Sequence, residues 1–69
     1  MKRPTQQEVN ELFDKLLPIC SLEEIAVVLD KREHTVWCWK AGRRIPSAAD
    51  FFVMQRILQE RLGKAGKAS

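Results

Sequence analysis

Apolar side chains recur at helical spacing along most of this chain. Between residues 6 and 17 they repeat about every 3.6 residues, which predicts an amphipathic helix with one buried stripe. The stripe consists of Val9, Leu12, Phe13, Leu16 and Leu17. Thr5 followed by Glu8 forms a capping-box pattern at the start of this helix, and Pro18 cannot continue the hydrogen-bond ladder at its end.

A second helix is predicted over residues 22 to 29. Ser21 and Glu24 repeat the capping pattern just before and within its first turn. Three apolar residues share one face of this helix: Ile25, Val28 and Leu29. The run "VVL", with its β-branched valines, would by itself favour a strand. The capping pattern and the lack of a partner strand favour a helix.

A turn and a third helix follow. Asp30 and Lys31 interrupt the apolar pattern and predict a tight turn of about three or four residues. The third helix runs from about residue 33 to 41 and ends at Gly42, because glycine is a common C-terminal stop. The letters "RRIP" then predict an extended connector, since the residue before a proline avoids helical angles.

The last predicted helix covers residues 48 to 62. Ser47 with Asp50 gives its capping pattern. Its main apolar stripe contains Phe51, Met54, Leu58 and Leu62. Residues 63 to 69, with two glycines and two lysines, predict a flexible basic tail. The whole pattern indicates one all-α domain over residues 1 to 62, compact and built from four helices, with a fifth left open.

Both tryptophans of the chain lie in the third predicted helix. Each residue advances about 100° around a helix, so the side chains of Trp37 and Trp39 point about 200° apart. Val36 and Trp39 share the face that a short helix must bury, which predicts a buried Trp39. Trp37 then faces outward with four other residues: Glu33, His34, Cys38 and Ala41. The opposite arrangement, with Trp37 buried and Trp39 exposed, is the alternative.

Charge is distributed unevenly along the chain. The net charge is +3, but residues 1 to 30 carry three basic and six acidic side chains, whereas residues 31 to 69 carry nine basic and three acidic ones. A basic segment of this kind is typical of a nucleic-acid partner, and a solvated basic surface is an equally good explanation of charge alone. The 69 residues, 45% of them hydrophobic, suit one small globular domain.

Several other classes of protein find little support. No apolar run approaches the length of a membrane span, and the polar start predicts no signal peptide, so we expect a cytoplasmic protein. Cys20 and Cys38 are too few for a disulfide framework, and His34 with Cys38 lacks the further ligands that zinc requires, so we expect no metal. No serine or carboxylate is placed to orient the single histidine, and no glycine-rich phosphate loop exists. We therefore expect neither an enzyme nor a cofactor.

The stretch "SLEEIAVVLDKREHTVWCWKAGRRIPS", residues 21 to 47, has characteristic residue types at seven positions. They are a small residue, an apolar residue three further on, a turn, an apolar pair, a glycine and a proline: Ala26, Leu29, Asp30, Val36, Trp39, Gly42 and Pro46. This set resembles the helix-turn-helix of the phage Cro and lambda-repressor-like family, also called the XRE type. Three positions depart from it, since Asp30 replaces a glycine, Lys31 an apolar residue and Arg32 a Ser or Thr cap.

The resemblance implies a lambda-repressor-like fold with a helix-turn-helix over about residues 22 to 41. In such a motif the second helix lies in the DNA major groove. By position, the resemblance implies base contacts from Glu33, His34, Trp37 and Cys38. It implies phosphate contacts from Arg32, Lys40, Arg43 and Arg44. Two alternatives stay open: Glu33 pairs with Arg32 or Lys40 instead, and Arg43 and Arg44 are plain solvated surface.

The function that the resemblance implies is regulation of transcription. We expect a repressor of phage or mobile-element type that binds an inverted-repeat operator in double-stranded DNA as a homodimer and regulates its own promoter. A second apolar stripe on the last helix, made of Phe52, Val53 and Ile57, is the expected dimer interface, unless it packs against the first helix. The other hypothesis is a protein-interaction module that uses this scaffold without reading DNA, because Trp37 and Cys38 replace the usual polar readers. Neither hypothesis calls for a small-molecule ligand.

Overall fold

A computed structural model describes residues 2–67, and the side chains of residues 2–63. It contains four α-helices: α1 (Gln6–Leu16), α2 (Leu22–Leu29), α3 (Glu33–Ala41) and α4 (Ala48–Lys67). No strand occurs within residues 2–67. The predicted all-α domain of four helices is therefore confirmed. None of the helices in this range combines the length and the apolar character that crossing a lipid bilayer would require.

The predicted caps set where the helices begin. The N–H of Glu8 donates to Thr5 Oγ1 at 3.1 Å and the N–H of Thr5 donates to Glu8 Oε1 at 2.9 Å, which completes a capping box. Ser21 and Glu24 form the same pair of bonds before α2. Before α4 only the bond from the Asp50 N–H to Ser47 Oγ forms, at 3.1 Å. We attribute the missing return bond to the aspartate side chain, which is one methylene shorter than glutamate.

The helices α2 and α3 end in the same way. Asp30 adopts left-handed angles (φ 55°, ψ 46°), and the N–H of Lys31 reaches back to the carbonyl of Ala26 at 2.9 Å. At the end of α3, Gly42 has φ 83° and the N–H of Arg43 donates to the carbonyl of Cys38 at 2.9 Å. Both are Schellman motifs, which satisfy the free carbonyls of a last helical turn. Asp30 thus takes the conformation that a glycine would adopt more easily.

The core lies where the four helices meet. The buried apolar residues that pack together are Val9, Leu12, Phe13, Leu16, Cys20, Ile25, Ala26, Val36, Trp39, Met54, Ile57 and Leu58. The first helix contributes its predicted stripe, with Leu17 packed only partly against the cluster. On α2, however, Val28 is more than half exposed, although it was predicted to share the apolar face. Ala26 is buried in the core instead. An eight-residue helix that crosses its neighbours buries only the narrow part of its apolar face that they cover.

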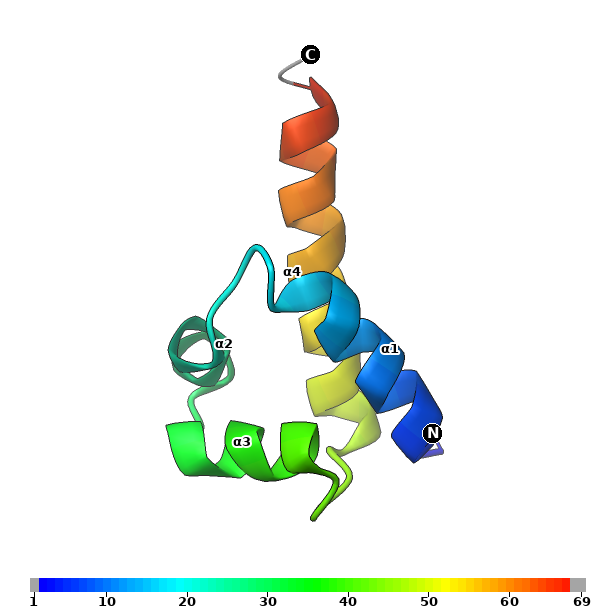
Figure 1. Ribbon diagram of the computed structural model, residues 1–69. Helices are drawn as coiled ribbons and strands as arrows, with labels where there is room; N and C mark the ends of the chain where they lie inside the picture. Colours follow the sequence, from blue (N-terminus) through cyan, green and yellow to red (C-terminus); the bar gives the residue numbers. More distant parts are fainter. Residues whose placement is uncertain (1, 68–69) are drawn as a thin grey trace.

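The last helix is longer than predicted. It continues to Lys67, so the expected end at residue 62 was wrong, and residues 68 and 69 lie outside the described part of the chain. Glycine lowers helix stability by only about 1 kcal/mol, so Gly63 and Gly66 do not end a helix that already has many turns. Figure 1 shows that the C-terminal half of α4 projects beyond the other three helices. This explains why Leu62, predicted to lie on the buried stripe, is more than half exposed.

Candidate nucleic-acid interface

The third helix lies at one side of the molecule, on the surface opposite the projecting end of α4. Figure 1 shows α3 lengthwise at this side and α2 nearly end-on beside it, so the two helix axes cross steeply. The three-residue turn Asp30–Arg32 joins them, as predicted. Helix α3 packs against α2 and α1 and leaves its other face to solvent. This exposed face is the surface on which the resemblance places the site.

The two tryptophans point to opposite sides of α3. Trp39 is 4% exposed and belongs to the core with Val36, whereas Trp37 is 42% exposed. The predicted assignment is confirmed, and the reverse one is wrong. Glu33, His34 and Ala41 are exposed like Trp37, as predicted.

Trp37 is held in place by two neighbours. The ring of His34 stacks on the indole, with 5.8 Å between the centroids and 14° between the planes. The guanidinium carbon of Arg43 lies 5.5 Å from the centroid of the same indole, a cation–π distance. The pairing of His34 with Trp37 could have been predicted from their i, i+3 spacing. The contact from Arg43 could not, because it depends on how the connector leaves the helix.

Four cationic side chains surround this face. Arg32, Lys40, Arg43 and Arg44 are all exposed. Among the described residues, ion pairs join Glu60 to Arg56 and Glu24 to Arg61, and none joins Glu33 to Arg32 or Lys40. The alternative in which Glu33 pairs with Arg32 or Lys40 is therefore not found in the structure. The charge of the four cations is not neutralised by an acidic partner in this part of the chain.

Cys38 does not face outward with Trp37, contrary to the prediction. It is only 8% exposed. Adjacent residues on a helix point about 100° apart, so Cys38 lies at the edge of the exposed face rather than at its centre. The connector then folds back over this edge, because the N–H groups of Arg43 and Arg44 both point at the Cys38 carbonyl, at 2.9 and 3.4 Å. The Cys38 sulfur lies 3.6 Å from His34 Nε2, one helical turn away along the same edge.

Two hollows flank the exposed face. One, of about 410 Å³, is lined by Leu22, Glu33, His34 and Trp37. The other, of about 440 Å³, is lined by Arg32, His34, Thr35, Cys38 and Arg44. His34 lines both. The first is largely apolar with one carboxylate in its wall, and the second is basic. The sequence did not indicate Leu22 as a site residue, because its place beside α3 depends on how α2 and α3 cross.

The N-terminus of α3 differs from those of the other helices. Its N-cap is Arg32, and among the described side chains none accepts a hydrogen bond from the first backbone N–H groups. The departure of Arg32 from a Ser or Thr cap, noted in the sequence, thus leaves these donors without a side-chain acceptor. Such N–H groups and the positive end of the helix dipole favour a negatively charged group nearby.

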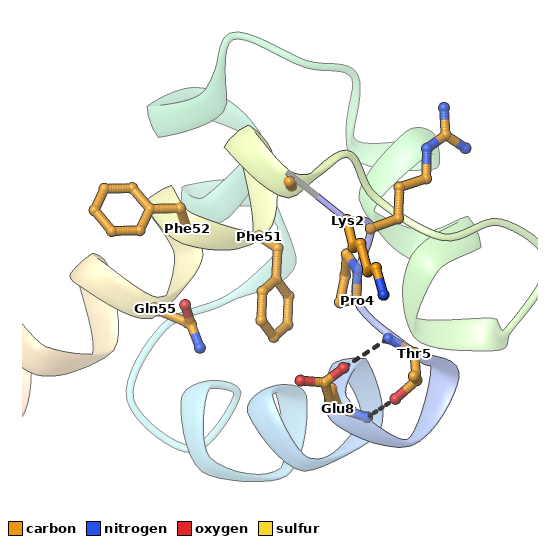
Figure 2. Close-up of a pocket in the computed structure, with 9 residues that line it drawn as sticks. Lys2, Pro4, Thr5, Glu8, Phe51, Phe52 and Gln55 are labelled. Atoms are coloured by element: carbon orange, nitrogen blue, oxygen red, sulfur yellow. Dashed lines mark hydrogen bonds between the residues drawn. The ribbon is translucent and has the colours of Figure 1, made fainter.

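The expected dimer interface is only partly available. Phe52 is 53% exposed and Val53 is half-buried, but Ile57 is 8% exposed and belongs to the core. Figure 2 shows Phe51 directed toward α1 and Phe52 directed away from it. A hollow of about 390 Å³ beside these two rings is lined by the N-terminal segment and by residues of α1 and α4, Pro4 and Glu8 among them. Ile57 was wrongly assigned because it lies on the face of α4 that packs into the core.

Comparison with known proteins adds no relative. No protein-family model, no curated protein and no solved structure matches this chain.

Proposed function

We propose that this protein is a sequence-specific DNA-binding regulator of transcription, a repressor of phage or mobile-element type. In this proposal the α2–α3 unit acts as a lambda-repressor-like helix-turn-helix, and α3 enters the major groove. The protein binds an inverted-repeat operator as a homodimer and regulates its own promoter. A regulator of this kind acts in the bacterial cytoplasm, on the nucleoid.

One observation carries the proposal. Trp37 is exposed on α3 and contacts His34 and Arg43. Arg43 and the three other exposed cations at the two ends of α3 form no ion pair within the part of the chain that the structure describes. An exposed aromatic ring that is ordered by its neighbours offers apolar contact area at a low cost in side-chain entropy. The surrounding positive charge favours a polyanion such as the DNA backbone. A plain solvated surface explains the cations but gives no reason for the exposed indole.

The residues of α3 divide into two roles. Glu33, His34 and Trp37 project from its first two turns, where a recognition helix meets base edges. Arg32, Lys40, Arg43 and Arg44 lie around them and would contact phosphates, which sets the register without reading sequence. The N–H groups at the start of α3, which lack a side-chain cap, would donate hydrogen bonds to a phosphate oxygen. Cys38 is nearly buried and is assigned no base contact.

The homodimer rests on a smaller surface than the sequence indicated. Phe52 is the exposed aromatic residue of α4 and lies next to the hollow shown in Figure 2. A single helix in one groove makes few base contacts, and helix-turn-helix proteins gain specificity by placing two recognition helices about one DNA turn apart. We assign Phe52, with the exposed edge of Val53, to the contact between the two copies.

The test is selection of bound sequences from a random duplex DNA library at a fixed, near-physiological salt concentration. The expected result is one inverted repeat with half-sites about one helical turn apart. The double variant Arg43→Ala with Arg44→Ala should select nothing. The matched control is Arg56→Ala, which also removes an exposed arginine but from α4.

Recovery of unselected sequences by the native protein would contradict the proposal. In that case Trp37 becomes the candidate contact for a protein partner, and the alternative of an interaction module on the same scaffold takes its place.

A further inference from the structure

The apolar hollow beside α3 has an unusual wall for a surface that faces nucleic acid. Leu22 from the start of α2 and Trp37 from α3 supply apolar surface, and Glu33 and His34 supply polar atoms. The hollow measures about 410 Å³ and is open to solvent. Phosphates do not suit it, because Glu33 brings a carboxylate next to the apolar part. An occupant therefore needs an apolar group beside a hydrogen-bonding group.

The indole that lines this hollow is ordered by two neighbouring side chains. His34 stacks on the ring at 5.8 Å and Arg43 lies over it at 5.5 Å, and both contacts are made with ring faces. Because the ring is already ordered, little side-chain entropy remains to be lost on binding.

The edge of a pyrimidine in the major groove carries this combination. A methyl group on C5 lies next to the substituent on C4, which is an amino donor in cytosine and a carbonyl acceptor in thymine. The methyl group would contact Leu22 and Trp37. The carboxylate of Glu33 would accept from the amino group of a methylated cytosine, and a donor nitrogen of His34 would serve the carbonyl of thymine.

We propose that this hollow reads the C5-methyl group of one pyrimidine in each half-site. The inference rests on the proposed DNA-binding function. It goes beyond it because it assigns Leu22 to the site and makes methylation of the base a determinant of affinity. The methyl group has two sources, thymine and 5-methylcytosine, and the experiment distinguishes them.

The experiment uses the selected operator with one base changed at a time. Replacing each thymine by uracil removes only the methyl group, and replacing each cytosine by 5-methylcytosine adds only that group. Dissociation constants are measured by fluorescence anisotropy at one salt concentration. At one position in each half-site we expect the methyl group to tighten binding by about fourfold, the effect of one buried methyl group.

The variants locate the effect. Trp37→Ala should reduce the affinity ratio between methylated and unmethylated bases to about one. If that variant loses all specific binding, Leu22→Ala gives the same test, because Leu22 lines the hollow from α2. Val27→Ala is the control, because Val27 is an exposed apolar residue of α2 outside the hollow. It should leave the ratio as in the native protein. Glu33→Gln should weaken the preference for 5-methylcytosine over cytosine and leave the preference for thymine over uracil unchanged.

The outcomes separate the two proposals. Specific operator binding that responds to no methyl group at any position overturns this inference and leaves the proposed function standing. Unselective binding, or none, overturns the proposed function and this inference with it. A response to uracil alone identifies thymine as the source, and a response to 5-methylcytosine alone identifies the modified base.

Discussion

Trp37 and Trp39 lie on opposite sides of α3: the first is 42% exposed and the second only 4%. The two side chains are therefore expected to affect different properties of the protein. Trp39 packs in the core against Val36 and its neighbours, so its loss should act on stability. Trp37 contacts His34 and Arg43 at the surface, so its loss should act on the proposed recognition of DNA.

Trp39→Ala should lower the free energy of unfolding by about 3–5 kcal/mol, because a large core side chain is removed. Trp37→Ala should lower it by less than about 1 kcal/mol. Urea titration followed by circular dichroism measures both, and Trp39→Phe replaces the first variant if that one does not fold. In single-tryptophan proteins, acrylamide should quench Trp37 strongly and Trp39 weakly. Equal quenching of the two would contradict the assignment.

Asp30 and Gly42 both have left-handed backbone angles, and they should respond to substitution in opposite directions. Asp30→Gly should stabilise the protein by about 0.5–1 kcal/mol, because glycine adopts φ 55° without a steric penalty. Gly42→Ala should destabilise it by about 1 kcal/mol or more at φ 83°. A Cβ at Gly42 would lie 3.6 Å from the Gln6 side chain, an ordinary contact, so the backbone alone is the cause.

Gly63→Ala is the matched control for that comparison. Gly63 lies within α4 with nothing within 4 Å of an added Cβ. Alanine should therefore stabilise the helix there by about 0.5–1 kcal/mol. Thermal melts of the three variants rank their stabilities. A stabilising effect of Gly42→Ala would show that the left-handed turn is not present in solution.

In the proposed complex with DNA, the exposed arginines should determine how binding depends on salt. Each phosphate contact contributes about 0.9 to the slope of log K against log salt. Arg43→Ala and Arg44→Ala should each reduce this slope by about that amount, without changing the circular dichroism spectrum. Arg56→Ala, on α4, should leave the slope unchanged. If all three variants lowered the slope equally, only net charge would matter and the α3 surface would not be the interface.

Phe52 and Ile57, five residues apart on α4, should separate dimerisation from folding. Phe52 is 53% exposed and Ile57 is 8% exposed. Phe52→Ser should give a folded monomer by sedimentation equilibrium, whereas Ile57→Ala should cost about 2–5 kcal/mol of stability. A native protein that stays monomeric at high concentration with operator absent and present would remove the homodimer from the proposal.

Cys20 should make stability depend on pH in the alkaline range. Burial raises the pKa of its thiol above the ordinary value of 9.0, Glu24 raises it further, and Arg61 acts in the opposite direction. The unfolded chain therefore loses the thiol proton at a pH where the folded protein still holds it. The stabilisation is fully present below pH 9.0 and is lost as the pH rises from there through the folded pKa.

Urea titrations at a series of pH values above neutrality measure this loss. The slope attributable to the thiol cannot exceed about 1.4 kcal/mol per pH unit. Cys20→Ala should remove that part of the slope and leave the rest of the pH profile unchanged. An identical pH profile for the native protein and this variant would show that the thiol ionises equally in both states.

The sequence by itself determined the helices and most of their ends. Helical periodicity and the caps at Thr5, Ser21 and Ser47 act within one or two turns, so they can be recognised without knowing the fold. The burial of Trp39 and the exposure of Trp37 follow from helix geometry once one face is assigned to the core. Of the predicted base-contact residues, Glu33, His34 and Trp37 are exposed on α3 as expected.

Only the tertiary structure decided which parts of each apolar stripe are covered. Val28 and Leu62 have suitable spacing but no neighbour to cover them, and Ile57 is buried in the core. Cys38 is covered because the connector folds back onto the end of α3, and Leu22 reaches α3 because the two helices cross. These are contacts between segments, whose free energy depends on how helices meet in space, and a local pattern carries no information about that.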